Sequence, residues 1–362
     1  MEEKTAAKKR STGNYFAIDQ AQFHKAVAKG LNEAIAFLIL ARGSDKKNIK
    51  TQWSVNAVEH YGGIGRSRAH TAIKALIAAG LVKQTRVGKR PSYNMVLTKE
   101  PKRVWLPNTL IDGTIKQEKP PIVKLRETGE VGPLHLFIDL YSCQDLAEDG
   151  GIPRTVFYHN YKRVSAGYAD KYQIWGFVRE GVTHALPHEV TKPHWTKRKG
   201  ESEDPIWKHL TTLQWLGLVE ETTNLYESSE DTSELIHVYG DRLKLEEKVG
   251  AGEELTSLES LESLGLLAHA AAVGMISLEQ GARACVELST TEDLLHLAPI
   301  ERHFSDPTMV TTYRLYYRPK TAKTSKWMAT LGKKKALYTR RYTDLYRKYS
   351  PNLERKVAME AA

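Results

Sequence analysis

The side chains best suited to chemistry in this 362-residue chain are cations and hydroxyls at helical spacing. Apolar residues over 67–79 recur with the period of an amphipathic helix. The polar face of that helix carries four residues: Ser67, Arg68, Thr71 and Lys74. An arginine on such a face can donate to O6 and N7 of a guanine in the major groove of DNA. Arg66 lies at the preceding turn, where a helix N-terminus also favours phosphate.

A basic turn follows this helix. The residue types over 81–85 and 93–97 predict two strands, and the turn between them holds three cations: Arg86, Lys89 and Arg90. Such a turn can reach the DNA backbone or an adjacent minor groove. Helix and turn together form the first predicted DNA-binding surface, with a solvated helix used for protein contacts as the alternative.

The C-terminal region is a second concentration of cations. Residues 318–349 hold eleven bases and one acid, and the net charge of this stretch, +10, equals that of the whole chain. Five of these bases are predicted to bind nucleic acid: Lys333, Lys334, Lys335, Arg340 and Arg341. Aromatic rings lie among them and could stack on bases. Four of the rings also fall at helical spacing, so burial in a core is the alternative for them: Tyr338, Tyr342, Tyr346 and Tyr349.

Motifs of enzymes are missing from the sequence. No phosphate-binding loop, HExxH, GxSxG or His-x-His pair occurs, so we expect no enzymatic activity and no cofactor. His184, His188 and His194 have spacings that would suit a zinc ion, but a polar loop is the preferred interpretation and no metal is predicted. Two cysteines are too few for a disulfide framework.

The elements that must position the first cations come in a characteristic order. A buried helix over 32–42, a helix over 54–61, a glycine break and the helix over 67–79 are followed by Gly80-Leu81-Val82 and the basic turn. This order resembles the winged helix-turn-helix of the MarR and GntR classes of DNA-binding domain. The resemblance covers 32–97 and implies that residues 67–79 form the recognition helix and the basic turn forms the wing.

A weak internal repeat extends the resemblance. Gly217-Leu218-Val219 repeats the spacing of Gly80-Leu81-Val82, after an apolar helix predicted from Pro133 and a helix predicted over 205–215. The equivalent turn is acidic, since residues 220–262 carry thirteen acids and three bases. Whether this second unit contacts DNA or protein is therefore left open.

The predicted fold class is mainly α with small β wings (α+β), with two winged-helix units and a helical, basic C-terminal region. The expected boundaries are a disordered basic arm over 1–15, a winged-helix DNA-binding domain over 16–98, a linker over 99–130, a divergent second winged-helix domain over 131–245 and a helical region with a basic aromatic tail over 246–362. Two winged helices with a basic extension are similar to replication initiators of plasmids and phages.

We therefore predict a sequence-specific double-stranded DNA-binding protein, with a replication initiator of a plasmid, phage or mobile element as its role. A transcriptional regulator is the alternative, and a protein-docking adaptor or scaffold is the alternative from another class. Partners would be duplex DNA and replication or transcription machinery, and self-association is left open. No apolar run is long enough to span a bilayer and no secretory signal begins the sequence, so a cytoplasmic protein is expected.

Overall fold

The computed structural model describes residues 14–88, 91–114, 119–145, 147, 150–185, 205–230, 232–240, 242–276, 295–318 and 322–360. The chain divides into two compact units. Unit 1 comprises Met1–Cys143, Glu189–Val219 and Leu315–Thr321. Unit 2 comprises Gln144–His188, Glu220–Arg314 and Ala322–Ala362.

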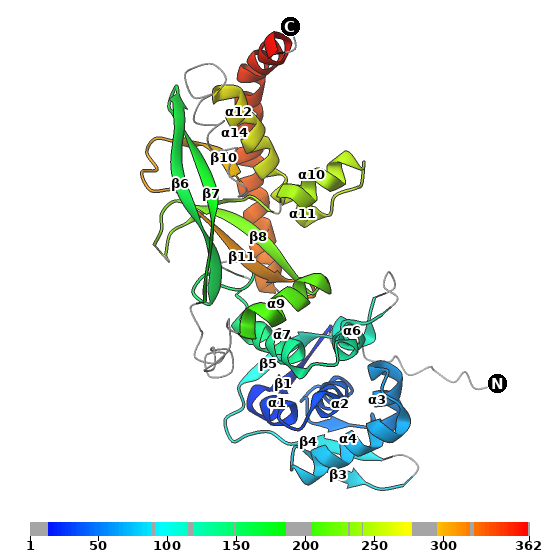
Figure 1. The fold of residues 1–362 in the computed structure, drawn as a ribbon. Coiled ribbons are helices and arrows are strands. Elements are labelled where there is room, and N and C mark those ends of the chain that lie inside the picture. Colours follow the sequence, from blue (N-terminus) through cyan, green and yellow to red (C-terminus); the bar gives the residue numbers. More distant parts are fainter. Residues whose placement is uncertain are drawn as a thin grey trace, which may run out of the picture. The chain divides into compact units, whose positions relative to one another are not determined.

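Three helices and a small sheet occupy the first half of unit 1 (Figure 1). The elements are α2 (Leu31–Arg42), β2 (Lys50–Thr51), α3 (Val55–Gly62), α4 (Arg66–Ala78), β3 (Val82–Arg86) and β4 (Ser92–Met95). Helix α2 is central because eight successive residues from Ala34 to Ala41 are buried. The strands lie in the order β2-β4-β3, and both pairs are antiparallel. The two helices predicted over 32–42 and 67–79 and the two predicted strands are confirmed to within two residues.

The remainder of unit 1 packs an apolar core. Strand β1 (Tyr15–Asp19) pairs antiparallel with β5 (Arg103–Pro107). The helices are α1 (Gln20–Val27), α5 (Thr109–Asp112), α6 (Pro121–Glu127), α7 (Val131–Cys143) and α9 (Pro205–Trp215). The segment 99–130, expected to be a linker, thus contains β5, α5 and α6.

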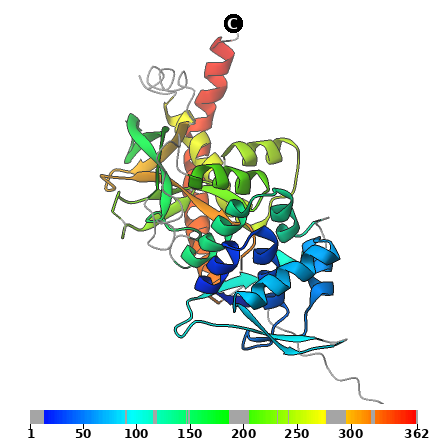
Figure 2. The ribbon, with the colours of Figure 1, turned by 60° about the horizontal axis from the view of Figure 1, so that its bottom comes forward.

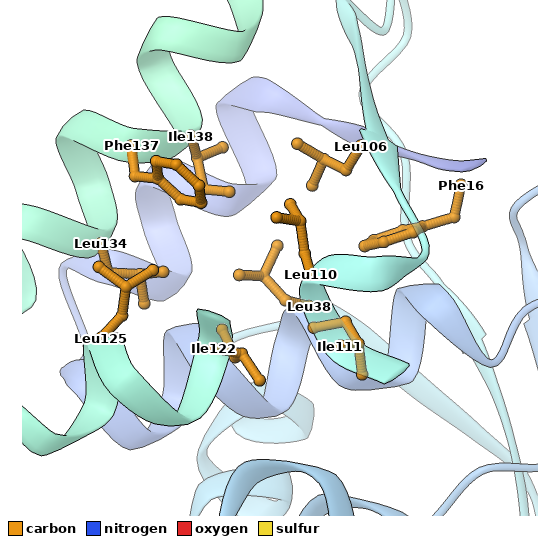
Figure 3. Close-up of a pocket in the computed structure, with 10 residues that line it drawn as sticks. All are labelled: Phe16, Leu38, Leu106, Leu110, Ile111, Ile122, Leu125, Leu134, Phe137 and Ile138. Atoms are coloured by element: carbon orange, nitrogen blue, oxygen red, sulfur yellow. The ribbon is translucent and has the colours of Figure 1, made fainter. Parts of the chain in front are cut away.

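Figure 3 shows where these elements meet. Apolar side chains from β1, α2, β5, α5, α6 and α7 point toward one another, among them Phe16, Leu38, Leu106, Ile111, Ile122 and Leu134. The cavity between them has a volume of about 10 Å³, which is about one water molecule. It is therefore packed core with no room for a ligand.

Unit 2 contains a six-stranded antiparallel sheet that curls into a half-barrel. Its strands lie in the order β10-β7-β6-β11-β8-β9. Their bounds are β6 (Phe157–Ala169), β7 (Tyr172–Ala185), β8 (Val219–Tyr226), β9 (Leu235–Val238), β10 (Leu295–Glu301) and β11 (Thr308–Leu315). The longest pair, β6 and β7, is a hairpin in which Ala169 opposes Tyr172. Asp170 makes the turn in the left-handed region, at φ 50°.

The predicted fold class is wrong. Helices make up 46% and strands 26% of the structure, so the protein is not mainly α with two small wings. The difference between the predicted and the observed strand content lies largely in residues 157–185, which form the long β6–β7 hairpin. The many polar residues of this segment do not by themselves indicate strands. Aromatic and β-branched residues alternate there with polar ones, which suits a sheet that is buried on one face.

Helices complete unit 2. They are α10 (Arg242–Gly250), α11 (Ser257–Glu262), α12 (Leu264–Ile276) and α14 (Ala322–Glu360). Helices α12 and α14 lie side by side along the sheet in both views (Figures 1 and 2). Small residues on α12 let α14 approach closely, and a Cβ on Gly274 would lie 3.3 Å from atoms of Tyr349. Burial of apolar side chains between these helices and the sheet forms the core of unit 2.

The internal repeat predicts one local detail that the structure confirms. Gly80 and Gly217 have φ values of 71° and 67°. In each case the N–H of the next leucine donates to the leucine five residues earlier, over 3.0 Å for Leu81 and 2.9 Å for Leu218. This is the helix termination in which a left-handed glycine lets the chain reverse. The strands that follow differ, because β3 joins a three-stranded sheet and β8 joins the six-stranded sheet.

Candidate nucleic-acid interface

The polar face of α4 is solvent-exposed, as expected. Ala69, Ala72, Ile73 and Leu76 are buried against unit 1. The five residues predicted to contact DNA from this helix are exposed: Arg66, Ser67, Arg68, Thr71 and Lys74. Ser67, Thr71 and Lys74 share one side because they lie three, four or seven residues apart, and Arg66 and Arg68 flank them on either side. Their positions place cations and hydroxyls along one helix face of the kind that can enter a major groove.

The cations of α4 differ in their surroundings. Arg66 donates to Asn56 Oδ1 over 2.8 Å and lies 3.4 Å from a carboxylate oxygen of Glu59. Among the described residues, neither Arg68 nor Lys74 has a carboxylate within ion-pair distance. Glu59 is the one acid in the sequence between 54 and 98, against seven lysines and arginines. The charge of this face is therefore little compensated.

The hairpin of β3 and β4 continues the basic surface. Arg86 is exposed at the end of β3, and Val87 beyond it is 83% exposed. The hydroxyl groups of Thr85 and Ser92 share a hydrogen bond of 2.8 Å across the hairpin. This bond lies beside the last residue pair of the two strands, Arg86 and Ser92. Lys89 and Arg90, the other two predicted contacts, lie outside the described residues.

Sequence reasoning missed two residues of this surface. Lys83 on β3 is exposed, and so is His70, which lies on α4 midway between Arg66 and Lys74. The spacing of His70 at four residues from each could have identified it. The sequence pattern identifies Lys83 less clearly, because the pairing of β3 with β4 decides which side of this short strand faces solvent.

The aromatic rings of the C-terminal region mostly belong to the core. Tyr338, Tyr342 and Tyr349 on α14 are buried, and Tyr346 is 41% exposed. Complete burial raises the pKa of Tyr342, whose hydroxyl lies 3.4 Å from His237 Nδ1. The three buried rings are therefore not accessible for stacking on bases, and they belong to the core, which was the alternative for them.

The five predicted cations of α14 fall into two groups. Lys334 pairs with Glu234 at 2.6 Å, and Arg341 lies 3.6 Å from Glu301. Lys335 donates to Ser260 Oγ. Lys333 and Arg340 are exposed and have no ion pair in the described part of the chain. Three of the five therefore have partners within unit 2, and two are open to solvent.

Exposed cations nevertheless form a stripe on α14. Lys326, Lys333, Arg340 and Arg347 recur every seven residues and are all exposed, so they share one face of the helix. We call these four residues the α14 ridge. At 1.5 Å per residue it spans about 32 Å, close to one turn of B-DNA. Lys326 and Arg347 were not among the predicted contacts, although a seven-residue period identifies them.

The helix equivalent to α4 in the internal repeat is less basic. On α9, Lys208 pairs with Glu130 at 3.1 Å. Thr211 and Thr212 each donate to the backbone carbonyl four residues earlier, at 3.0 Å. This face offers no exposed arginine, in contrast to α4.

A polar cluster crosses the sheet of unit 2. His159 on β6 lies 2.5 Å from the Tyr313 hydroxyl, and Arg179 on β7 pairs with Glu221 on β8 at 3.3 Å. Burial, with the Arg179 charge, lowers the pKa of His159 to about 4. Burial beside Glu221 raises the pKa of Tyr313. The Tyr313 hydroxyl also donates to Glu221 Oε1 at 3.4 Å, so the cluster ties the four strands β6, β7, β8 and β11 together.

Of the histidines weighed for zinc, His188 and His194 lie outside the described residues, and the side chain of His184 is not described. In the part of the chain that the structure describes, no helix combines the length and apolarity that crossing a membrane requires. Comparison of the chain with protein-family models, with curated proteins and with solved structures gave no match.

Proposed function

We propose that this chain is a sequence-specific double-stranded DNA-binding protein that places α4 in the major groove. The observation that carries the proposal is the exposed face of α4, where Arg68 and Lys74 have no acidic partner among the described residues. The order helix, strand, helix, helix, hairpin with the sheet order β2-β4-β3 supports a winged helix-turn-helix in this part of unit 1. Lys83 and Arg86 on β3 would then contact the backbone.

We infer the role of a replication initiator of a plasmid, phage or mobile element, acting in the cytoplasm. Unit 2 supports this role with the α14 ridge, a second basic surface that would bind phosphates without reading sequence. The apolar cavity of unit 1, at about 10 Å³, is too small for an effector, whereas a polar pocket of about 430 Å³ in unit 2 is lined by Lys171, Glu301, Arg302 and His303. A transcriptional regulator therefore stays the alternative, and replication machinery would be the protein partner of an initiator.

The test begins with the full-length protein and a pool of genomic duplex fragments. Fragments retained at rising salt would be sequenced, and a retained site would be made as a labelled duplex for fluorescence anisotropy. The variant Arg68→Ala/Lys74→Ala is expected to weaken binding to this duplex at least tenfold, since a side chain that contacts a base contributes about 1–3 kcal/mol.

The matched control is Lys25→Ala/Lys29→Ala, which removes two exposed cations elsewhere in unit 1. It should change the dissociation constant less than threefold. If both variants weakened DNA binding equally, the binding would be nonspecific electrostatic attraction, which would contradict recognition by α4. Wild-type protein that retains no fragment at low salt would contradict it and favour the adaptor.

A further inference from the structure

A cluster of two imidazoles and a carboxylate lies inside unit 1, away from α4. His24 on α1 and His135 and Asp139 on α7 each bring one ligand atom within 4.8 Å of the others. His24 Nε2 lies 2.7 Å from Asp139 Oδ1, and His135 Nε2 lies 3.4 Å from Asp139 Oδ2. The two imidazole rings meet edge to face, with centroids 4.8 Å apart.

The carboxylate of Asp139 has an unusual environment for an anion. Its side chain is completely buried. Oδ1 accepts a hydrogen bond from Gln20 Nε2 at 3.1 Å and lies within reach of His24. Oδ2 accepts no hydrogen bond from the described residues. A buried anion with an unused oxygen is costly unless a cation or donor meets it.

We propose that His24, His135 and Asp139 bind a divalent transition-metal ion of the zinc class. Imidazole nitrogen and carboxylate oxygen are ligands that zinc prefers, at about 2.0–2.2 Å. Two such ligands on a tetrahedral ion lie roughly 3.4 Å apart, which matches the separation of His135 Nε2 from Asp139 Oδ2. A modest movement of His24 Nε2 away from Asp139 Oδ1 would make it the third ligand of the ion.

The fold presents the site in a usable form. His135 and Asp139 lie four residues apart, so they project from one face of α7, and α1 supplies the third ligand. The His24 side chain is 22% exposed, which gives an ion access from solvent. Three protein ligands leave one position for water. The bound ion would join α1 to α7 and stabilise unit 1, whether or not the protein binds DNA.

The test uses the full chain, stripped with EDTA and titrated with Zn²⁺ alone. Equilibrium dialysis is expected to give one zinc per chain, and zinc should raise the thermal midpoint of unfolding. His24→Gln and His135→Gln should each weaken zinc binding at least tenfold and remove the thermal shift. His24→Gln is the decisive variant, because this side chain is partly exposed and the glutamine amide can keep a hydrogen bond to Asp139 Oδ1.

Two controls separate this site from others in the chain. His60→Gln removes an exposed histidine of unit 1 and should leave zinc binding unchanged. His188→Gln/His194→Gln removes two of the three histidines whose sequence spacing would suit a zinc ion. Zinc binding that survives His24→Gln, or that is lost in His188→Gln/His194→Gln, would overturn the proposal. So would the absence of saturable zinc binding by the wild-type protein.

Discussion

Arg66 and Arg68 at the start of α4 have different environments, because residues two apart project to different sides of a helix. Arg66 is held by Asn56 and Glu59 at 2.8 and 3.4 Å, and Arg68 has no ion pair among the described residues. A guanidinium that already has partners must give them up to bind a base. We therefore expect Arg68 to read sequence and Arg66 to position the helix.

Arg68→Ala should weaken specific binding by about 1–3 kcal/mol and relax the base preference at one position of the site. Arg66→Ala should weaken binding less and leave the preferred sequence unchanged. Selection of sites from a random duplex pool, carried out with each variant, measures both effects. An unchanged consensus with Arg68→Ala would contradict the assignment.

Buried histidines make unit 2 sensitive to acid. Burial lowers the pKa of His237 to about 3 and contributes to lowering that of His159 to about 4, from an ordinary value of 6.5. Below pH 6.5 the unfolded chain binds protons that the folded unit does not, so stability falls as the pH falls. Between pH 7 and 5 the expected loss from His237 is about 2 kcal/mol, and His159 adds to it in the same direction.

Urea unfolding at pH 7, 6 and 5, followed by a probe in unit 2, measures this loss. His237→Gln should reduce the dependence on pH, even if the variant is less stable at pH 7, because one titrating group is gone. A free energy of unfolding that stays constant from pH 7 to 5 would contradict the neutral, buried state of these histidines.

At the scale of elements, the two glycine terminations provide a direct comparison. Gly80 and Gly217 lie in the left-handed region, and a Cβ at either would meet no atom within 4 Å. Alanine at these positions therefore costs backbone strain alone, about 1–2 kcal/mol. Gly80→Ala and Gly217→Ala should lower the free energy of unfolding by similar amounts.

Gly65→Ala is the matched control. Gly65 has φ −56° and equally open surroundings, so alanine there meets no backbone strain and loses only the preference for glycine at the N-cap of α4; it should cost less than alanine at Gly80 or Gly217. Thermal unfolding of the three variants makes the comparison. If Gly65→Ala were as destabilising as the other two, backbone conformation would not explain the repeated glycines.

The α14 ridge gives a prediction about salt. Lys333 and Arg340 are exposed without an ion pair in the described residues, whereas Lys334 is paired with Glu234. Lys333→Ala/Arg340→Ala should reduce the slope of log affinity against log salt by about two, since each phosphate contact contributes about 0.9. Lys334→Ala should leave the slope unchanged. An unchanged slope in the double variant would remove the ridge from the DNA interface.

At the scale of the whole molecule, local patterns predicted local structure well. The helix predicted over 205–215, with Pro205 at its first position, has those bounds in the structure. Apolar periodicity and glycine stops act within a few residues, which is why they identified α4 and its exposed face.

Long-range pairing was beyond such reasoning. The order β10-β7-β6-β11-β8-β9 joins strands far apart in the sequence, and no local pattern specifies it. The same limit applies to sites. His24 and Asp139 meet across 115 residues, and folding brings Lys334 and Lys335 to partners far away in the sequence. Charge counts cannot distinguish a cation open to solvent from one that is paired.

We propose that the face of α4 reads duplex DNA. Retention of genomic fragments by the full-length protein across a salt titration, with sequencing of what is retained, tests it most directly. If α4 reads sequence, the retained fragments will share a short site that survives rising salt and disappears with Arg68→Ala/Lys74→Ala. A repeated array of that site beside an origin would favour the initiator. Retention without sequence preference, or no retention at low salt, would contradict the claim.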